Sequence, residues 1–250
     1  MVKKSFLCLL CLLAPLAAGS DCKQPLEENT LRQLRLGVTD LQLQPGDSHQ
    51  LVLAIFTSYS PAQEVPACAT WKVEPEGKGA TISDTGLLKI DVKTPAGSTF
   101  TVTADIEKGR AQRQIPVVVF TLENQPLVGF WRQLSRSDCT PEKDQAPVSP
   151  INEMEFRANG WFSVTWQPFE TYRDYWGSYT ADKSNGALTL TIETGNYVPG
   201  NFKGTGKFKL KDDKTLEMNG IFLGEQRSTT SRENGPQKDK TCQYVFTRIS

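Results

Sequence analysis

Acidic residues are the first candidates for chemistry in this chain, because its 250 residues include a single histidine, His49. One histidine excludes most Ser/His/Asp and Cys/His catalytic sites and His-rich metal sites. Glu155, Glu170 and Asp174 could supply the paired carboxylates of a hydrolase, which lie roughly 5 to 9.5 Å apart across a substrate. Acids on loops and outer strand faces are far commoner. We therefore predict no enzyme, catalytic residue, metal or cofactor, and keep an acid–base hydrolase or isomerase as an alternative.

Aromatic side chains gather in residues 166–176, and Tyr197 and Phe202 follow further along the chain. Such side chains combine flat apolar surface with polar tips, which suits a small amphipathic ligand or the loop of a partner protein. The alternative is that they fill the interior of the fold, which is the role we favour for Trp131. The predicted ligand-binding residues are Trp131, Phe169, Tyr172, Tyr175, Trp176, Tyr197 and Phe202.

The first twenty residues have the pattern of a secretory signal peptide. Lys3 and Lys4 precede an apolar run at 6–18, and Gly19 and Ser20 provide a small-residue exit. We expect the protein to be exported, to the periplasm, the cell surface or the medium. Loss of residues 1–20 removes two of the 28 basic residues and leaves 28 acidic ones, so the formal charge is about −2. This charge does not favour nucleic acid as a partner. No later apolar run approaches the ~20 residues that span a bilayer, so we predict no transmembrane segment.

Four cysteines remain after the signal: Cys22, Cys68, Cys139 and Cys242. An even number in an exported protein predicts two disulfides, with three pairings open. Cys22 also resembles the lipidated cysteine of bacterial lipoproteins. Asp21 stands where that motif expects Gly, Ala or Ser, so we do not favour a lipid anchor at Cys22.

The mature chain is predicted to be nearly all β, because alternating apolar and polar residues recur throughout between turn-forming residues. Residues 25–36 are the exception and suit a short helix or a first strand. A break at 122–127 separates a first half, 21–121, from a second, 128–250. The strands predicted in the first half are 34–38, 41–43, 50–57, 69–73, 80–82, 87–92, 100–106 and 112–120.

This first half resembles the bacterial Ig-like domains of the group 2 type. The resemblance rests on the turn Leu-Gln-Leu-Gln-Pro-Gly at 41–46, Thr-Trp-Lys-Val at 70–73, Ala-Thr-Ile-Ser-Asp-Thr-Gly-Leu-Leu at 80–88 and Phe-Thr-Val-Thr-Ala at 100–104. It implies a β-sandwich with Trp71 in the core, used as a spacer or adhesion module. Cys68 precedes the Trp71 strand, where it could bond Cys22.

The second half contains eight predicted strands, at 128–135, 151–158, 161–166, 171–181, 187–193, 203–211, 215–223 and 242–249. Eight consecutive antiparallel strands can close into an up-and-down barrel and so remove their unpaired edges. The Gly-Phe-Trp at 129–131 matches the Gly-x-Trp that begins the first strand of lipocalins, so this half resembles a lipocalin-like domain. Another small barrel or a sandwich is the alternative.

Connections at opposite ends of such a barrel alternate along the chain. The second, fourth and sixth connections, at 159–160, 182–186 and 212–214, are tight turns. The other four, at 136–150, 167–170, 194–202 and 224–241, are long or aromatic and must share the other end, which is therefore the predicted mouth. If the first and last strands pair, Cys139 and Cys242 flank that seam and are close enough to bond.

From these observations we predict an exported, non-catalytic binding protein. The barrel mouth would bind a small amphipathic ligand or an envelope protein partner, and the Ig-like half would be a spacer that holds the mouth outward. A structural or adhesive envelope protein with a side-chain-filled barrel is the main alternative.

Overall fold

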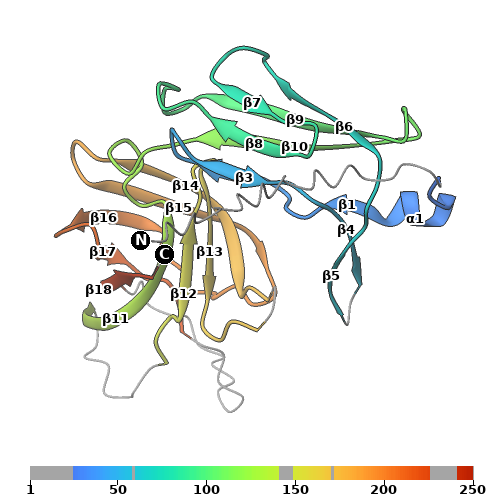
Figure 1. The fold of residues 1–250 in the computed structure, drawn as a ribbon. Coiled ribbons are helices and arrows are strands. Elements are labelled where there is room, and N and C mark those ends of the chain that lie inside the picture. The colour runs from blue at the N-terminus through green and yellow to red at the C-terminus, as the bar shows by residue number, and fades with distance from the viewer. Residues whose placement is uncertain (1–24, 58–59, 141–148, 170–171, 226–240, 250) are drawn as a thin grey trace, which may run out of the picture.

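The computed structural model describes residues 25–249, with the exception of 58–59, 141–148, 170–171 and 226–240. The described chain is all β apart from one short helix, and it forms a β-sandwich beside a closed barrel (Figure 1). The elements of the sandwich are α1 (Glu28–Gln33), β1 (Leu34–Leu36), β2 (Leu41–Leu43), β3 (Ser48–Gln50), β4 (Leu53–Thr57), β5 (Ser60–Glu64), β6 (Ala69–Glu74), β7 (Ala80–Ile82), β8 (Leu87–Ile90), β9 (Thr99–Ile106) and β10 (Ala111–Val119).

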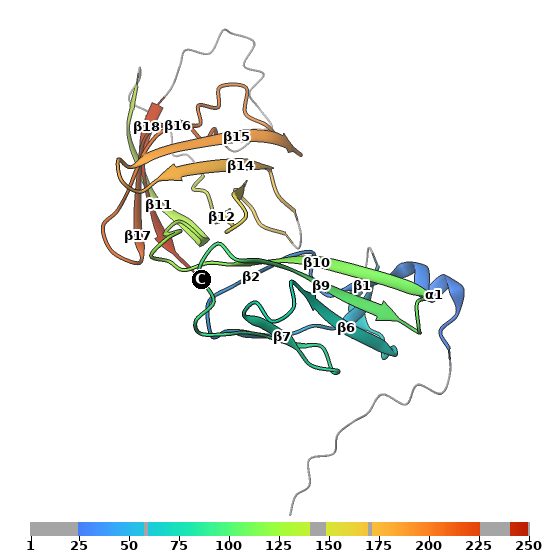
Figure 2. The same ribbon diagram turned by 90° about the horizontal axis from the view of Figure 1, so that it is seen from above.

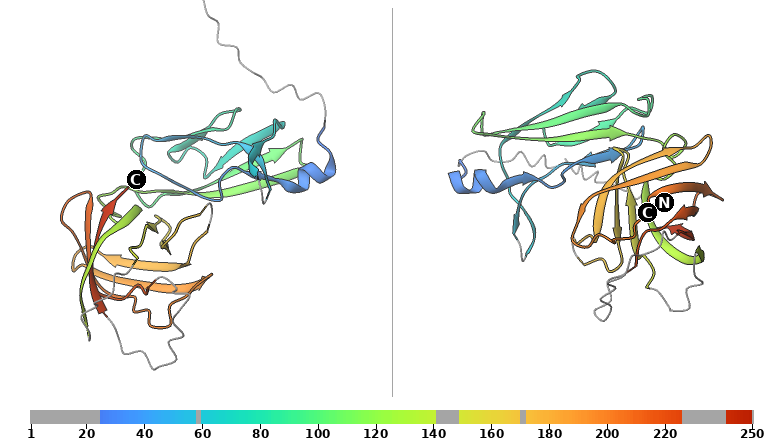
Figure 3. Two further views of the ribbon diagram at one scale, coloured as in Figure 1. Left: turned by 90° about the horizontal axis from the view of Figure 1, so that it is seen from below. Right: turned by 180° about the vertical axis from the view of Figure 1, so that it is seen from behind.

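The sandwich consists of three small sheets around one apolar core. Their strand orders are β1-β4-β5, β2-β10-β9-β6 and β3-β8-β7, and β2 with β10 is the one parallel pair among the described strands. Alternation in β9 shows how the core forms, since Phe100, Val102 and Ala104 are buried and face their counterparts on the other sheets. The helix α1 lies at the end of the sandwich remote from the barrel (Figures 2 and 3).

Three features of the sandwich differ from the sequence prediction. The predicted strand 50–57 divides into β3 and β4, which belong to different sheets. β5 was not predicted, because Ser-Pro-Ala-Gln-Glu lacks apolar alternation; it is an edge strand paired with β4 alone, where Pro61 is tolerated. Trp71 is only half-buried, because β6 is itself an edge strand of its sheet.

The eight predicted strands of the second half are present and their closure is confirmed. They are β11 (Gly129–Thr140), β12 (Glu153–Phe156), β13 (Trp161–Thr165), β14 (Tyr175–Asp182), β15 (Ala187–Gly195), β16 (Thr205–Leu210), β17 (Thr215–Ile221) and β18 (Thr241–Arg248). Each strand pairs with its sequence neighbours, and β11 pairs antiparallel with β18 to complete the ring. This is the up-and-down order.

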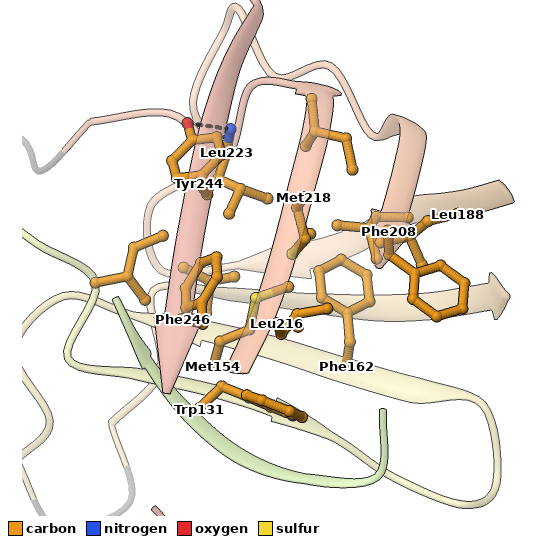
Figure 4. Packing of buried hydrophobic residues seen from close by; sticks show 14 of the residues in the cluster. Trp131, Met154, Phe162, Leu188, Phe208, Leu216, Met218, Leu223, Tyr244 and Phe246 are labelled. Atoms are coloured by element: carbon orange, nitrogen blue, oxygen red, sulfur yellow. Dashed lines mark hydrogen bonds between the residues drawn. The ribbon is translucent and has the colours of Figure 1, made fainter. Parts of the chain in front are cut away.

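Large side chains fill much of the barrel interior. Among the described residues, twenty buried ones form one contiguous cluster, and eight of the largest are Trp131, Trp166, Tyr175, Tyr244, Phe156, Phe162, Phe222 and Phe246. Trp131 lies at one end of this cluster, and Tyr244 and Leu223 lie at the other (Figure 4). The interior is therefore a packed core over most of its length.

Arg248 and Trp131 close the end of the barrel nearest the sandwich. The guanidinium of Arg248 lies 4.2 Å from the centre of the Trp131 ring, and its Nη2 donates to the carbonyl oxygen of Pro126 at 2.7 Å. The indole Nε1 donates to the carbonyl oxygen of Leu127 at 2.7 Å. The end of β18 and the start of β11 are thus both tied to the residues that lead in from the sandwich.

The hairpin between β12 and β13 carries the contact between the two halves. Arg157 donates from Nη1 to both carboxylate oxygens of Asp40, at 3.0 and 2.9 Å, and the amide of Ala158 donates to Gln42 at 2.7 Å. Tight connections of the barrel therefore face the sandwich. Because alternate connections lie at opposite ends, the mouth faces away from it, as the position of the β15–β16 connection shows (Figure 2).

The Asp40–Arg157 pair should measurably couple the two halves. Both side chains are largely buried, at 27% and 21% exposed, so we expect a double-mutant cycle of Asp40→Asn and Arg157→Gln to give a coupling energy of about 1–3 kcal/mol in urea unfolding. The exposed pair Glu28–Arg32 on α1 is the matched control and should give roughly 0.5 kcal/mol or less. Equal coupling in the two cycles would show that the interface pair does not join the halves.

Candidate ligand site at the barrel mouth

The mouth is built from the ends of β11, β13, β15 and β17 and the starts of the strands that follow them. Cys139 and Cys242 form a disulfide here, as predicted, across the seam between β11 and β18. Cys68 is also disulfide-bonded. Its predicted partner, Cys22, lies outside the described residues. Disulfides persist in oxidising compartments, so the bridge is compatible with export.

Three of the predicted site residues pack together below the rim. Tyr175 is fully buried, and its hydroxyl donates to the carbonyl oxygen of Leu223 at 2.6 Å. The Phe202 ring lies 5.7 Å from the Tyr175 ring, and Trp166 lies 6.0 Å from Tyr175 and 6.1 Å from Tyr197. Tyr197 and Phe202 are partly exposed. These side chains therefore form the floor of the mouth.

Two other predicted residues stand at the rim itself. Phe169 is 74% exposed and Tyr172 is 41% exposed, and Val198 on the next mouth connection is 46% exposed. The Tyr172 hydroxyl donates to Asp174 at 3.1 Å. Large side chains with apolar surface are thus exposed on both of these mouth connections.

Trp176 and Trp131 do not join this group. Trp176 is half-buried and pairs with Ser163 on the outer face of the barrel wall, because it follows the inward-facing Tyr175 in the strand. Trp131 is buried at the opposite end, which agrees with the interior role that we favoured for it.

Arg136 belongs to the mouth and was missed from the sequence. Its side chain is only 7% exposed, its guanidinium lies 6.0 Å from the centre of the Phe222 ring, and Nη1 donates to Glu225 at 3.3 Å. The same residue pairs with Tyr244 across the seam. A cation is therefore held among aromatic rings where the barrel opens.

The buried hydroxyls around Arg136 are kept neutral. Burial raises the pKa of Tyr244 to about 12, against the opposing effects of a backbone hydrogen bond from Leu223 and of the charge and hydrogen bonding of Arg136. Burial likewise raises the pKa of Tyr175 well above its usual value. At neutral pH Arg136 therefore lies beside neutral phenols, with Glu225 as a partly exposed counter-ion.

Alkaline pH should destabilise the barrel through these tyrosines. Burial raises the pKa of Tyr179 and Tyr244 from 10.0 to about 12, so their stabilising effect is complete below pH 10 and is lost as the pH rises through 12. We expect the free energy of unfolding to fall by about 3 kcal/mol for each of the two tyrosines, measured as a falling urea midpoint. Phenolate absorbance of both residues that develops near pH 10 in the folded protein would contradict this expectation.

The acids considered for catalysis occupy separate positions. Glu155 is 2% exposed on the outer face of β12, where Arg157 and Arg173 bind its two oxygens at 2.6 and 3.3 Å. Asp174 accepts the amide of Trp166 at 2.8 Å and the Tyr172 hydroxyl. Glu170 lies outside the described residues. Glu155 and Asp174 are thus each engaged in holding the mouth connection between β13 and β14.

Comparisons with known proteins do not name a family. No family model matches the chain, and no curated protein matches it. Among solved structures the chain is similar to the crystal structure of human protocadherin-24 EC1-2, with 14% identity over 85% of this chain and 94% of that one, at a TM-score of 0.25. A score this low does not establish a common fold. Across the described residues, no helix has the length and apolar character needed to cross a membrane.

Proposed function

We propose that this protein is an exported, non-catalytic binding protein whose barrel mouth takes a small amphipathic ligand with an acidic group. The sandwich acts as a spacer that holds the mouth outward, and the barrel is a lipocalin-like domain. Arg136 binds the acidic group of the ligand, and Phe169, Tyr172 and Val198 cover its apolar part.

Burial of Arg136 is the observation that carries this proposal. Removal of a guanidinium from water costs several kcal/mol unless an opposite charge or hydrogen bonds compensate it. Arg136 is nevertheless 7% exposed and lies 6.0 Å from the centre of the Phe222 ring at the open end of the barrel, so this end holds a fixed positive charge that suits an acidic group. Glu225 is 43% exposed, so an incoming carboxylate or phosphate can take its place without entering the core. A guanidinium can bind such a group through two parallel N–H donors.

The packed interior limits how deeply a ligand can enter. Ring contacts run from Phe156 through Phe162 and Tyr175 to Phe202, so they connect the lower barrel with the mouth. The proposed ligand therefore lies across the mouth, above Tyr175, rather than along the barrel axis. The packed interior also favours a second candidate function, in which the protein is a structural envelope protein and the filled barrel has no ligand site.

Binding of dodecanoate separates these two functions. We expect the purified full-length mature protein to bind dodecanoate in calorimetry and to bind dodecanol at least several-fold more weakly. Arg136→Gln should weaken dodecanoate binding by roughly 10- to 100-fold, the usual effect of losing hydrogen bonds to a charged group. Arg132→Gln is the matched control, because Arg132 lies on the same strand with an exposed side chain.

A second pair of variants tests the rim. Phe169→Ala should weaken dodecanoate binding, whereas Phe56→Ala should not, because Phe56 is an exposed phenylalanine of the sandwich. Absence of dodecanoate binding to the wild-type protein, or unchanged binding by both Arg136→Gln and Phe169→Ala, would favour the structural function.

A further inference from the structure

The sandwich carries an open groove that is separate from the mouth. Its volume is about 660 Å³, and it lies where β6 faces the connections of the other two sheets. Trp71 lines it together with Gln50, Glu64, Asp84 and Thr85. The other lining residues are apolar: Leu51, Val52, Leu53, Val65, Pro66, Ala67 and Ala69. A tryptophan that the sequence places in the core is thus partly exposed in a groove that presents polar and apolar groups together.

Gly86 fixes the position of the Trp71 ring. Its φ is +82°, and a Cβ at this position would lie 2.9 Å from Cε2 of the Trp71 ring and 3.0 Å from the carbonyl oxygen of Leu51. Glycine therefore lets the turn before β8 pack directly on the indole. The ring is supported by backbone and held in one place rather than free to rotate.

The same turn places polar groups beside the indole. The Gln50 side-chain amide donates to the carbonyl oxygens of Leu51 at 3.0 Å and Thr85 at 2.7 Å, so it joins β3 to the turn. Asp84 and Glu64 are exposed, and neither carboxylate has an ion-pair partner among the described residues. No lysine or arginine is present among the described residues that line the groove.

We propose that this groove binds an uncharged oligosaccharide. A sugar ring presents C–H groups on its face, which pack on an aromatic ring, and hydroxyl groups at its edge, which donate to carboxylates and amides. Trp71 supplies the first surface, and Asp84, Glu64 and Gln50 supply the second. Two unpaired carboxylates disfavour an anionic ligand, and their exposure beside the ring disfavours a purely apolar one. The proposal is independent of the function proposed for the mouth.

Titration of the mature protein with chitohexaose, cellohexaose, maltohexaose and mannohexaose tests this inference. We expect at least one of these probes to bind in calorimetry and to shift the indole resonance of Trp71 in NMR spectra. Trp71→Leu should weaken that binding by roughly five- to tenfold, and Trp71→Phe by less, because phenylalanine keeps part of the stacking surface. Asp84→Ala should also weaken it.

Two controls keep the result interpretable. Trp176→Leu on the barrel should leave sugar binding unchanged, and the circular dichroism of each variant shows whether the sandwich is folded. If Trp71→Leu does not fold, the Trp71→Phe and Asp84→Ala variants decide the question. Binding of none of the four probes by the wild-type protein, or undiminished binding by the folded groove variants, would overturn the proposal.

Discussion

Replacement of Trp131 by alanine is expected to lower the free energy of unfolding of the barrel by about 3–5 kcal/mol. The side chain is fully buried, and its loss leaves a cavity at the closed end. It also leaves the carbonyl oxygen of Leu127 without its indole donor and removes the ring on which Arg248 packs. Urea unfolding followed by circular dichroism measures the change.

Trp176→Ala is the matched control for this prediction. Trp176 is half-buried on the outer face of the barrel, so its loss leaves no enclosed cavity and should cost markedly less. Arg248→Met, which keeps apolar volume over the ring but removes the donors to Pro126, should fall between the two. A cost for Trp131→Ala no greater than that for Trp176→Ala would show that the closed end does not depend on this packing.

Loss of the Cys139–Cys242 disulfide should have the second largest effect. The bridge joins residues 103 positions apart, so it restricts the unfolded chain strongly, and a loop of that length corresponds to about 2–5 kcal/mol. We expect this loss of stability in urea unfolding of the double variant Cys139→Ala, Cys242→Ala. The bridge also fixes the seam of the mouth, so binding at Arg136 should weaken as well.

A double variant is preferable to reduction in this experiment. A reductant would also open the disulfide of Cys68 in the sandwich, and the two effects would be mixed. Cys68→Ala is the control variant, whose loss should destabilise the sandwich and leave binding at the mouth unchanged. A double variant as stable as the wild-type protein, within 1 kcal/mol or so, would contradict the loop-closure argument.

Much of the barrel could be predicted because its signals are local. Alternation within strands gives the inward faces, and short polar turns such as Asn159-Gly160 mark the hairpins, so the strand count and parity follow. Because eight strands can close into a barrel, the strand count also predicts that the first strand pairs with the last and that Cys139 and Cys242 lie at this seam. Each of these steps uses either residues that are neighbours in sequence or the regular alternation of connections between the two ends of the barrel.

Arg136 shows where this reasoning fails. Strict alternation from Trp131 would point Ser135 inward and Arg136 outward. A bulge between Gln133 and Ser135 shifts the register, so that Ser135 is exposed and the Arg136 side chain is buried. Nothing in the local sequence marks this bulge, because it is set by pairing with β18 more than a hundred residues away.

The closed end and the sandwich edge show the same limit. Arg248 packs on Trp131 across 117 positions, and no pattern in either strand indicates that contact. Trp71 lies in a sequence motif that is typical of a sandwich core, yet it is partly exposed because β6 is an edge strand. Whether a strand lies at the edge or in the centre depends on the pairing of all strands in the sheet, which the sequence around Trp71 does not show.

NMR mapping of the dodecanoate site distinguishes binding at the mouth from binding elsewhere on the protein. We expect dodecanoate to shift the backbone amide resonances of Arg136, Tyr172 and Tyr197 at the mouth and to leave those of Asn159 and Gly160 at the closed end unchanged. Shifts confined to the closed end or the sandwich, or none at dodecanoate concentrations below its micelle point, would contradict binding at the mouth.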